Sequence, residues 1–182
     1  MTMSTSSAVF AAAVTASGPR PELADRLGLF APLIGSWSLS VFDYGPGDQV
    51  VQSSAEWHFS WALDGRAVAD VWINPSRLDR GPGADGEWGL SLRFYDVTVG
   101  TWRSTWHGPK KGWVIPFIVH PTADGMVLEG RRGDTALRWI FSELTADSFR
   151  WRAEETEPGG ATITRQRFEA RRMRPADIPP TS

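Results

Sequence analysis

The sequence predicts an all-β fold, a single up-and-down antiparallel barrel of about ten strands with a short N-terminal helix capping one end. From Gly35 to about Arg171, apolar and polar residues alternate with the period of two that strands require. Turn sequences such as GPGD, LDGR, ADG and EPGG separate the alternating segments. Closing the sheet would pair the edges that an open sheet of this size exposes. A two-sheet sandwich makes a similar pattern and is the competing fold.

One helix is predicted before the first strand. Pro21 suits the first turn of a helix, Pro32 limits its length, and Leu23, Leu27 and Phe30 share a face. Strands are then predicted, in order, at Ser36–Tyr44, Val50–Leu63, Ala67–Asn74, Leu90–Asp96, Thr101–His107, Trp113–His120, Met126–Arg131, Ala136–Glu143, Ser148–Thr156 and Thr162–Arg171.

The 182 residues suffice for one well-buried domain and are too few for two ordinary ones. We expect the barrel domain at 21–174, a disordered N-terminal tail at 1–20 and a flexible C-terminal tail at 175–182. The apolar segment Ala8–Ala16 resembles part of a signal peptide, but no basic residue precedes it. A tail is therefore the favoured interpretation.

Composition excludes several classes of partner. The net charge of -2 supplies no basic field for nucleic acid or an anionic membrane. No apolar segment approaches the roughly 20 residues that a membrane span needs. The absence of cysteine excludes disulfides and thiolate metal sites and agrees with a cytoplasmic protein. The oligomeric state stays open, a homodimer included.

Four segments carry a family resemblance: LIGSWSLSV, which contains Gly35-x-Trp37, then FSWALDGRAVADVW, LRFYDVTVGTWRSTW and RWIFSELTADSFRWRAEE. Over about Leu27 to Arg172 the chain resembles the lipocalin-like (calycin) and nitrobindin-like barrels, in an uncharacterised bacterial branch. The resemblance implies that Trp37 plugs the closed end of the barrel beneath the helix. Nitrobindin-like barrels bind haem through a late histidine, and the matching strand here, ATITRQRFEARR, has none. We therefore expect no haem and no other cofactor.

Strand alternation places most tryptophans on one face and most arginines on the other, and in water the aromatic face should line the interior. This predicts a cavity for a small hydrophobic or aromatic ligand, with indole N–H groups available to its carbonyl or hydroxyl oxygens. A fully packed aromatic core is the competing interpretation. The candidate ligand-binding residues are Trp57, Trp61, Trp72, Phe94, Trp102, Ser104, Trp106, Trp113, Trp139, Trp151 and Gln166.

The reverse arrangement would place arginines inside the barrel, where they could hold the carboxylate of an anionic lipid. It is disfavoured because most tryptophans would then face water. The arginines concerned are Arg93, Arg103, Arg138 and Arg152, which we expect on the outer surface. There they could pair across strands with Glu56, Glu129 and Glu154.

Whether the protein is an enzyme stays open. Asp70 shares a face with Trp72, and a carboxylate among indoles should hold its proton more tightly and could act as a general acid or base. The corresponding enzyme would be a cofactor-independent cyclase, isomerase or dehydratase of specialised metabolism with a polyketide- or terpenoid-like substrate. A structural carboxylate is the alternative. Glu56, His58 and His107 could form a metal site only from the face assigned outward, so we expect no metal.

Overall fold

The computed structural model describes residues 5–47, 49–81, 83 and 85–178. Within these residues, ten antiparallel strands close into one barrel in the order β1-β10-β9-β8-β7-β6-β5-β4-β3-β2. The predicted all-β up-and-down barrel is thereby confirmed. The strands are β1 (Gly35–Tyr44), β2 (Val50–Ala62), β3 (Ala67–Asn74), β4 (Glu87–Asp96), β5 (Thr101–Gly108), β6 (Trp113–Pro121), β7 (Met126–Arg132), β8 (Thr135–Ser142), β9 (Ser148–Thr156) and β10 (Thr162–Arg172).

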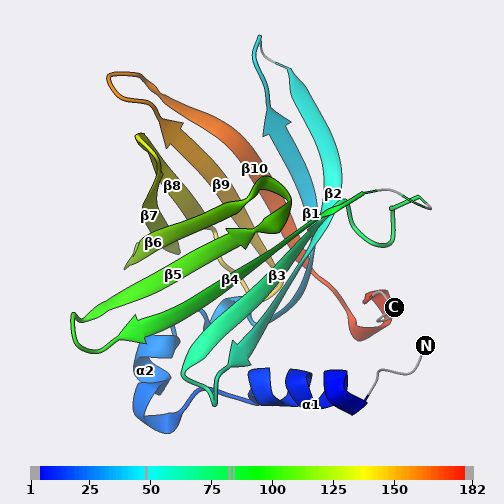
Figure 1. Cartoon of the computed structure of the whole chain (residues 1–182), viewed down its shortest axis with the longest axis vertical. Helices are drawn as coiled ribbons and strands as arrows, with labels where there is room; N and C mark the ends of the chain where they lie inside the picture. The colour runs from blue at the N-terminus through cyan, green and yellow to red at the C-terminus, as the bar shows by residue number, and fades with distance from the viewer. Residues whose placement is uncertain (1–4, 48, 82, 84, 179–182) are drawn as a thin grey trace.

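Short helices cover one end of the barrel and leave the other end open. In Figure 1 the helices lie at the bottom, and the hairpins β1–β2, β7–β8 and β9–β10 lie at the opposite end. The single helix predicted before the first strand is divided into η1 (Pro21–Leu23), α2 (Ala24–Leu27) and η2 (Ala31–Leu33). Pro32 lies in the last of these turns, where its ring prevents a longer helix.

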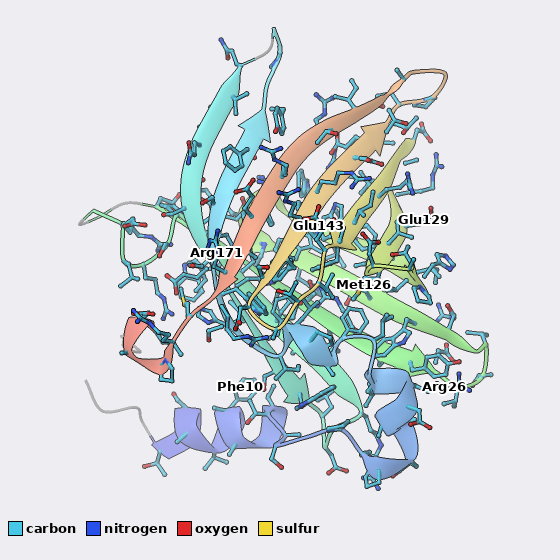
Figure 2. All side chains as sticks on the ribbon, turned by 180° about the vertical axis from the view of Figure 1, so that it is seen from behind. Phe10, Arg26, Met126, Glu129, Glu143 and Arg171 are labelled. Carbon is cyan, nitrogen blue, oxygen red and sulfur yellow. The ribbon has the colours of Figure 1, made fainter. Side chains whose placement is uncertain are left out.

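The plug of the closed end is apolar. Leu27, Phe30 and Leu33 are buried, and the ring of Phe30 lies edge-on to Trp102 with centroids 4.6 Å apart. Figure 2 shows Met126 just above these short helices, and its side chain is fully buried. Burial of these side chains against the barrel core is what holds the short turns in place.

The N-terminal segment differs from the predicted disordered tail. Residues Thr5–Val14 form helix α1, and Thr15 then makes an isolated bridge to Ala62 of β2. The alanine-rich composition explains the helix, because alanine has the highest helix propensity. Residues 1–4 lie outside the described residues. The predicted C-terminal tail begins with the short turn η4 (Pro175–Asp177), and residues 179–182 also lie outside the described residues.

The predicted inward face is confirmed for most strands. Tryptophan or other apolar side chains are buried or partly buried at the expected alternate positions of β1, β2, β5, β6, β8 and β9.

Strand β4 is the exception, and the face predicted for it is wrong. Leu90 and Phe94 lie on the outside, 44% and 40% exposed, while Ser91 and Arg93 point into the barrel. Gly89 also faces inward, and a Cβ atom there would collide with the ring of Trp106. The neighbouring strands therefore decide which face of β4 is buried, and they favour the side that has room for Trp106 and a partner for Asp70.

The Gly35-x-Trp37 motif forms the closed end of the core. Trp37 is fully buried, its indole N–H donates to the carbonyl of Leu33 at 2.8 Å, and its ring lies edge-on to Phe149. The guanidinium of Arg172 covers the same ring at 4.1 Å. Gly35 has a φ of 125°, and a side chain there would collide with Arg172. The motif is therefore structural, as the sequence predicts.

Candidate functional site

A cavity at the open end of the barrel is enclosed by a closed ring of five aromatic side chains. Successive rings have centroids 4.3 to 6.1 Å apart, and the first and last members of the series are also in contact. In order around the cavity they are Trp72, Trp106, Trp139, Trp151 and Phe168. We call this cavity the tryptophan slot.

Trp57 completes the slot from β2. Its ring lies 5.8 Å from Phe168 and 6.2 Å from Trp151 between centroids. The indole N–H of Trp57 donates to the Asp70 carboxylate at 2.6 Å, which fixes the orientation of the ring. One aromatic surface of the slot is thus anchored to a buried polar group.

The slot is narrow, with a volume of about 70 Å³. A dry apolar cavity of about 150 Å³ is known to accept benzene in another protein. A one-ring ligand therefore needs side chains at the mouth to move outward, and the mouth has such side chains. Lys111 is 48% exposed and Trp113 is partly buried.

Charged and amide groups surround the mouth. Lys111 pairs with Glu87 at 3.2 Å and also lies 4.8 Å from the centroid of Trp113. Gln166 donates to Asp43 at 2.7 Å. Two more cations, Arg132 and Arg165, both contact the carboxylate of Glu155, at 2.7 and 3.2 Å. An apolar slot below a polar mouth is the usual arrangement of a small-molecule site.

A second, larger hollow of about 460 Å³ lies between α2 and the ends of β4, β5 and β6. Its lining includes Arg26, Tyr95 and Trp102 at the closed end of the barrel. This hollow has the larger volume, but the lining favours the slot as a binding site, because aromatic side chains converge there from seven strands around one space.

Asp70 and Arg93 form a buried ion pair inside the barrel. Neither side chain is exposed, and Arg93 donates through Nη1 to Oδ2 of Asp70. The rings of Phe30 and Phe59 lie 5.4 and 5.6 Å from the guanidinium carbon. Burial lowers the pKa of Arg93 to about 9, which is still above neutral pH, and the adjacent carboxylate favours the charged form. Asp70 is therefore not the isolated carboxylate that the sequence suggested.

Most of the predicted ligand-binding residues meet at the slot. Those that line it are Trp57, Trp72, Trp106, Trp113, Trp139, Trp151 and Gln166. Trp61 is partly buried against the core, Trp102 lies at the closed end, and Ser104 is buried beside Arg93 in the register of β4 and β5. Phe94 lies outside the barrel because the face of β4 is reversed.

Glu87, Lys111 and Phe168 also line the slot, and none of them was predicted from the sequence. Phe168 could have been found, because it follows Gln166 by two residues on β10 and therefore shares its face of the strand. Glu87 could not, since the predicted strand began three residues later, at Leu90. Lys111 lies in the short turn η3 (Pro109–Lys111), where no alternation applies.

The arginines predicted outside mostly pair there with carboxylates. Arg138 contacts Glu129 at 3.4 Å and Glu154 at 3.1 Å, and Arg152 contacts Glu154 at 2.7 Å. The predicted outer position is wrong for Arg93, which alone of these four arginines is buried. The anionic-lipid arrangement, with all four arginines inside, is therefore wrong.

Glu56 organises a polar cluster on the outer face of β2. Its side chain is fully buried beneath the segment after β3 and accepts from the Ser76 hydroxyl at 3.1 Å and from Arg77 Nη2 at 2.8 Å. His58 lies 3.0 Å from the same carboxylate and 2.9 Å from the Ser36 hydroxyl. The cluster ties the segment that follows β3 to the barrel wall.

Ser36, His58 and Glu56 have the order of a nucleophile, a base and an acid. Acyl transfer also needs donors for the developing oxyanion. Strand β1 pairs with β2 on one side and β10 on the other, so the sheet takes up the backbone groups around Ser36. The cluster is therefore structural.

The conceivable metal site of Glu56, His58 and His107 is not assembled. The register His58↔Val71, Val71↔Leu90 and Leu90↔His107 places the two histidines three strands apart. At the usual strand spacing this separation is about 14 Å, too far for a shared ion. In the part of the chain that the structure describes, no group of three His, Asp or Glu side chains could hold a metal.

Acid should weaken the fold through Glu56. Burial acts to raise the pKa of this carboxyl, but hydrogen bonds from the side chain and backbone of Arg77 and from His58 lower it from 4.5 to about 2. A lowered folded-state pKa stabilises the protein fully above about pH 4.5, and this contribution is lost as the pH falls toward 2. The loss should reach about 3 kcal/mol.

Urea unfolding at a series of pH values between 6 and 2 measures this dependence. Glu56→Gln keeps the shape of the side chain and should remove this part of the pH dependence. An unchanged slope of stability against pH in the Gln variant would contradict the assignment.

Comparisons with known proteins support the fold. No family model matches the sequence, and no curated protein matches it. Among solved structures, the S-type phycobiliprotein lyase CPES from Guillardia theta is similar, with a TM-score of 0.54 and 12% sequence identity. The match covers 81% of this chain and 92% of that one. At this identity the likeness shows a shared barrel fold, and the activity in that name belongs to that protein.

Among the described residues, no helix is both long and apolar enough to cross a membrane. The match agrees with the barrel architecture that the family resemblance implied. The bacterial branch of that resemblance stays a prediction.

Proposed function

We propose that this protein binds one small, flat, apolar or aromatic molecule in the tryptophan slot and takes it up through the open end of the barrel. The closed ring of aromatic side chains carries the proposal. A ligand in the slot would contact several rings at once, and offset or edge-to-face contacts stabilise such a complex.

Binding without chemistry is the favoured role. The enzymatic alternative depends on Asp70, whose two oxygens are already held by Trp57 and Arg93. A carboxylate in a buried ion pair gains little by exchanging a proton with a substrate, because the guanidinium would then lose its partner. A carrier or sensor of a small molecule needs only the slot and its mouth.

The neutral fluorescent probe N-phenyl-1-naphthylamine tests this function. It should quench the intrinsic tryptophan fluorescence, with probe emission rising in proportion. Trp106→Ala removes one wall of the slot and should weaken probe binding at least about tenfold, the loss expected when a buried aromatic contact worth about 1.4 kcal/mol is removed.

Trp88→Ala is the matched control, because Trp88 is 45% exposed on the outer face of β4. Its affinity for the probe should equal that of the native protein. Equal losses in the two variants, or no loss in Trp106→Ala despite a native circular dichroism spectrum, would show that the probe binds elsewhere.

A further inference from the structure

Two walls of the slot carry hydrogen-bond donors without an acceptor. Trp72 and Trp151 are 7% and 4% exposed, and the indole Nε1 atom of each is buried with no partner among the described residues. By contrast, the indole N–H groups of Trp37 and Trp57 donate to Leu33 and Asp70. Leaving a buried N–H unpaired costs about 1–3 kcal/mol. A ligand atom that accepts a hydrogen bond from either indole would remove this cost.

Both donors belong to rings that are nearly parallel to Phe168. The interplanar angles are 17° for Trp72 and 14° for Trp151, with centroids 6.0 and 4.3 Å from that of Phe168. An indole donates in the plane of its ring, so these two N–H groups act edge-on. An acceptor that lies in the plane of a flat ligand could meet such a donor while the ligand itself packs against the aromatic walls.

The remaining buried and unpartnered side-chain atoms among the described residues can also donate a hydrogen bond. They are the hydroxyl of Ser91 and the N–H groups of Arg80 Nε, Arg93 Nε and Arg93 Nη2. Among the described residues each of these atoms can donate, and none is solely an acceptor. Arg80 lies in the segment between β3 and β4, whereas Ser91 and Arg93 add further unpaired donors inside the barrel.

Charge at the slot decides between a neutral and an anionic acceptor. Lys111, Arg132 and Arg165 each contact a carboxylate, of Glu87 or Glu155. The aromatic ring that encloses the slot carries no charge. An anion in the slot would lose its hydration without gaining an unpaired cation, which is costly.

We infer that the tryptophan slot selects neutral, flat molecules that carry a hydrogen-bond acceptor, such as a ring-bound carbonyl, for the N–H groups of Trp72 and Trp151. This inference rests on the proposed binding function and specifies its ligand class. It also predicts that the same framework without an acceptor binds more weakly, because both indole groups then stay unpaired.

A series of three naphthalenes tests the inference on the native protein. Calorimetric titration would compare 2-acetonaphthone, 2-ethylnaphthalene and 2-naphthoate, which share one framework and carry a neutral acceptor, no acceptor and an anion. The ketone should bind about two- to tenfold more tightly than the hydrocarbon, the range that one net hydrogen bond supplies. The carboxylate should bind most weakly.

The matched variants are Trp151→Phe and Trp139→Phe, which make the same change in neighbouring walls of the slot. Of these two residues, only Trp151 has a buried N–H without a partner among the described residues. Trp151→Phe should reduce the preference for the ketone over the hydrocarbon, and Trp139→Phe should preserve it. If either variant fails to fold, the affinities of the three compounds for the native protein still test the inference.

Equal affinities for the ketone and the hydrocarbon would overturn the inference and leave the proposed function standing, because water would then satisfy the indole groups. Tightest binding by 2-naphthoate would overturn the neutral ligand class. If none of the three compounds bound, both the inference and the proposed function would fall.

Discussion

Asp70→Asn is expected to lower the free energy of unfolding by about 3–5 kcal/mol, because it leaves the buried guanidinium of Arg93 without a counter-charge. The asparagine has nearly the same shape and can still accept a hydrogen bond from the indole N–H of Trp57. The loss of stability therefore reports the removed charge. Neither side chain of the pair is exposed, so solvent cannot screen the unpaired cation. Urea unfolding at neutral pH measures the change.

A second substitution separates charge from packing. Combining Asp70→Asn with Arg93→Met removes the cation as well, and this double variant should recover most of the lost stability. A loss below about 1 kcal/mol in the single variant, the size of an ordinary neutral hydrogen bond, would contradict a buried ion pair. Additive losses in the double variant would show that the two side chains act independently.

The same substitution separates the structural role of Asp70 from the catalytic one that the sequence suggested. A general acid or base would lose about 10²- to 10⁴-fold in turnover when replaced by asparagine, with the fold retained. A structural carboxylate loses stability and leaves probe binding unchanged in the protein that remains folded. We expect the second result, and the catalytic role stays an untested prediction.

Trp37→Ala should cost about 3–5 kcal/mol of stability, as expected for a large-to-small change in a packed core. Trp37 is fully buried, donates to Leu33 and packs between Phe149 and Arg172 at the closed end. Its removal opens a cavity beneath the helical plug. Thermal unfolding followed by circular dichroism gives the shift.

Trp37 is not among the residues that line the slot, so the folded fraction of Trp37→Ala should keep its affinity for the naphthylamine probe. Trp88→Ala, on the outer face, should change stability by less than about 1 kcal/mol. A melting temperature that is unchanged in Trp37→Ala would show that the environment of this residue has been misassigned. A selective loss of probe binding would show that Trp37 belongs to the site instead.

Local sequence patterns were sufficient to predict the barrel and most of the slot. Strict alternation fixes which side chains of β5, β8 and β9 share a face, and burial of the aromatic face follows from the hydrophobic effect. That reasoning placed Trp106, Trp139 and Trp151 on one face before their contacts were known. The closed end was implied by the family resemblance that the Gly35-x-Trp37 motif carries, and not by alternation.

The buried ion pair could not be predicted in this way. Alternation gives two faces for β4 but does not say which is buried when one carries Leu90 and Phe94 and the other carries Ser91 and Arg93. The choice depends on residues distant in sequence, since Asp70 of β3 supplies the partner that makes a buried arginine tolerable. The narrow width of the slot could not be predicted either, because it depends on contacts between aromatic rings that are distant in the sequence.

The indole N–H region of a ¹H–¹⁵N NMR spectrum tests the binding site most directly. The ten tryptophans give ten indole signals, which single Trp→Phe variants assign. On addition of 2-acetonaphthone, the signals of Trp72, Trp106, Trp139 and Trp151 should shift most, while those of Trp37 and Trp88 stay in place. Shifts confined to Trp88, or to Trp102 beside the larger hollow, would contradict binding in the tryptophan slot, as would an unchanged spectrum at the solubility limit of the ketone.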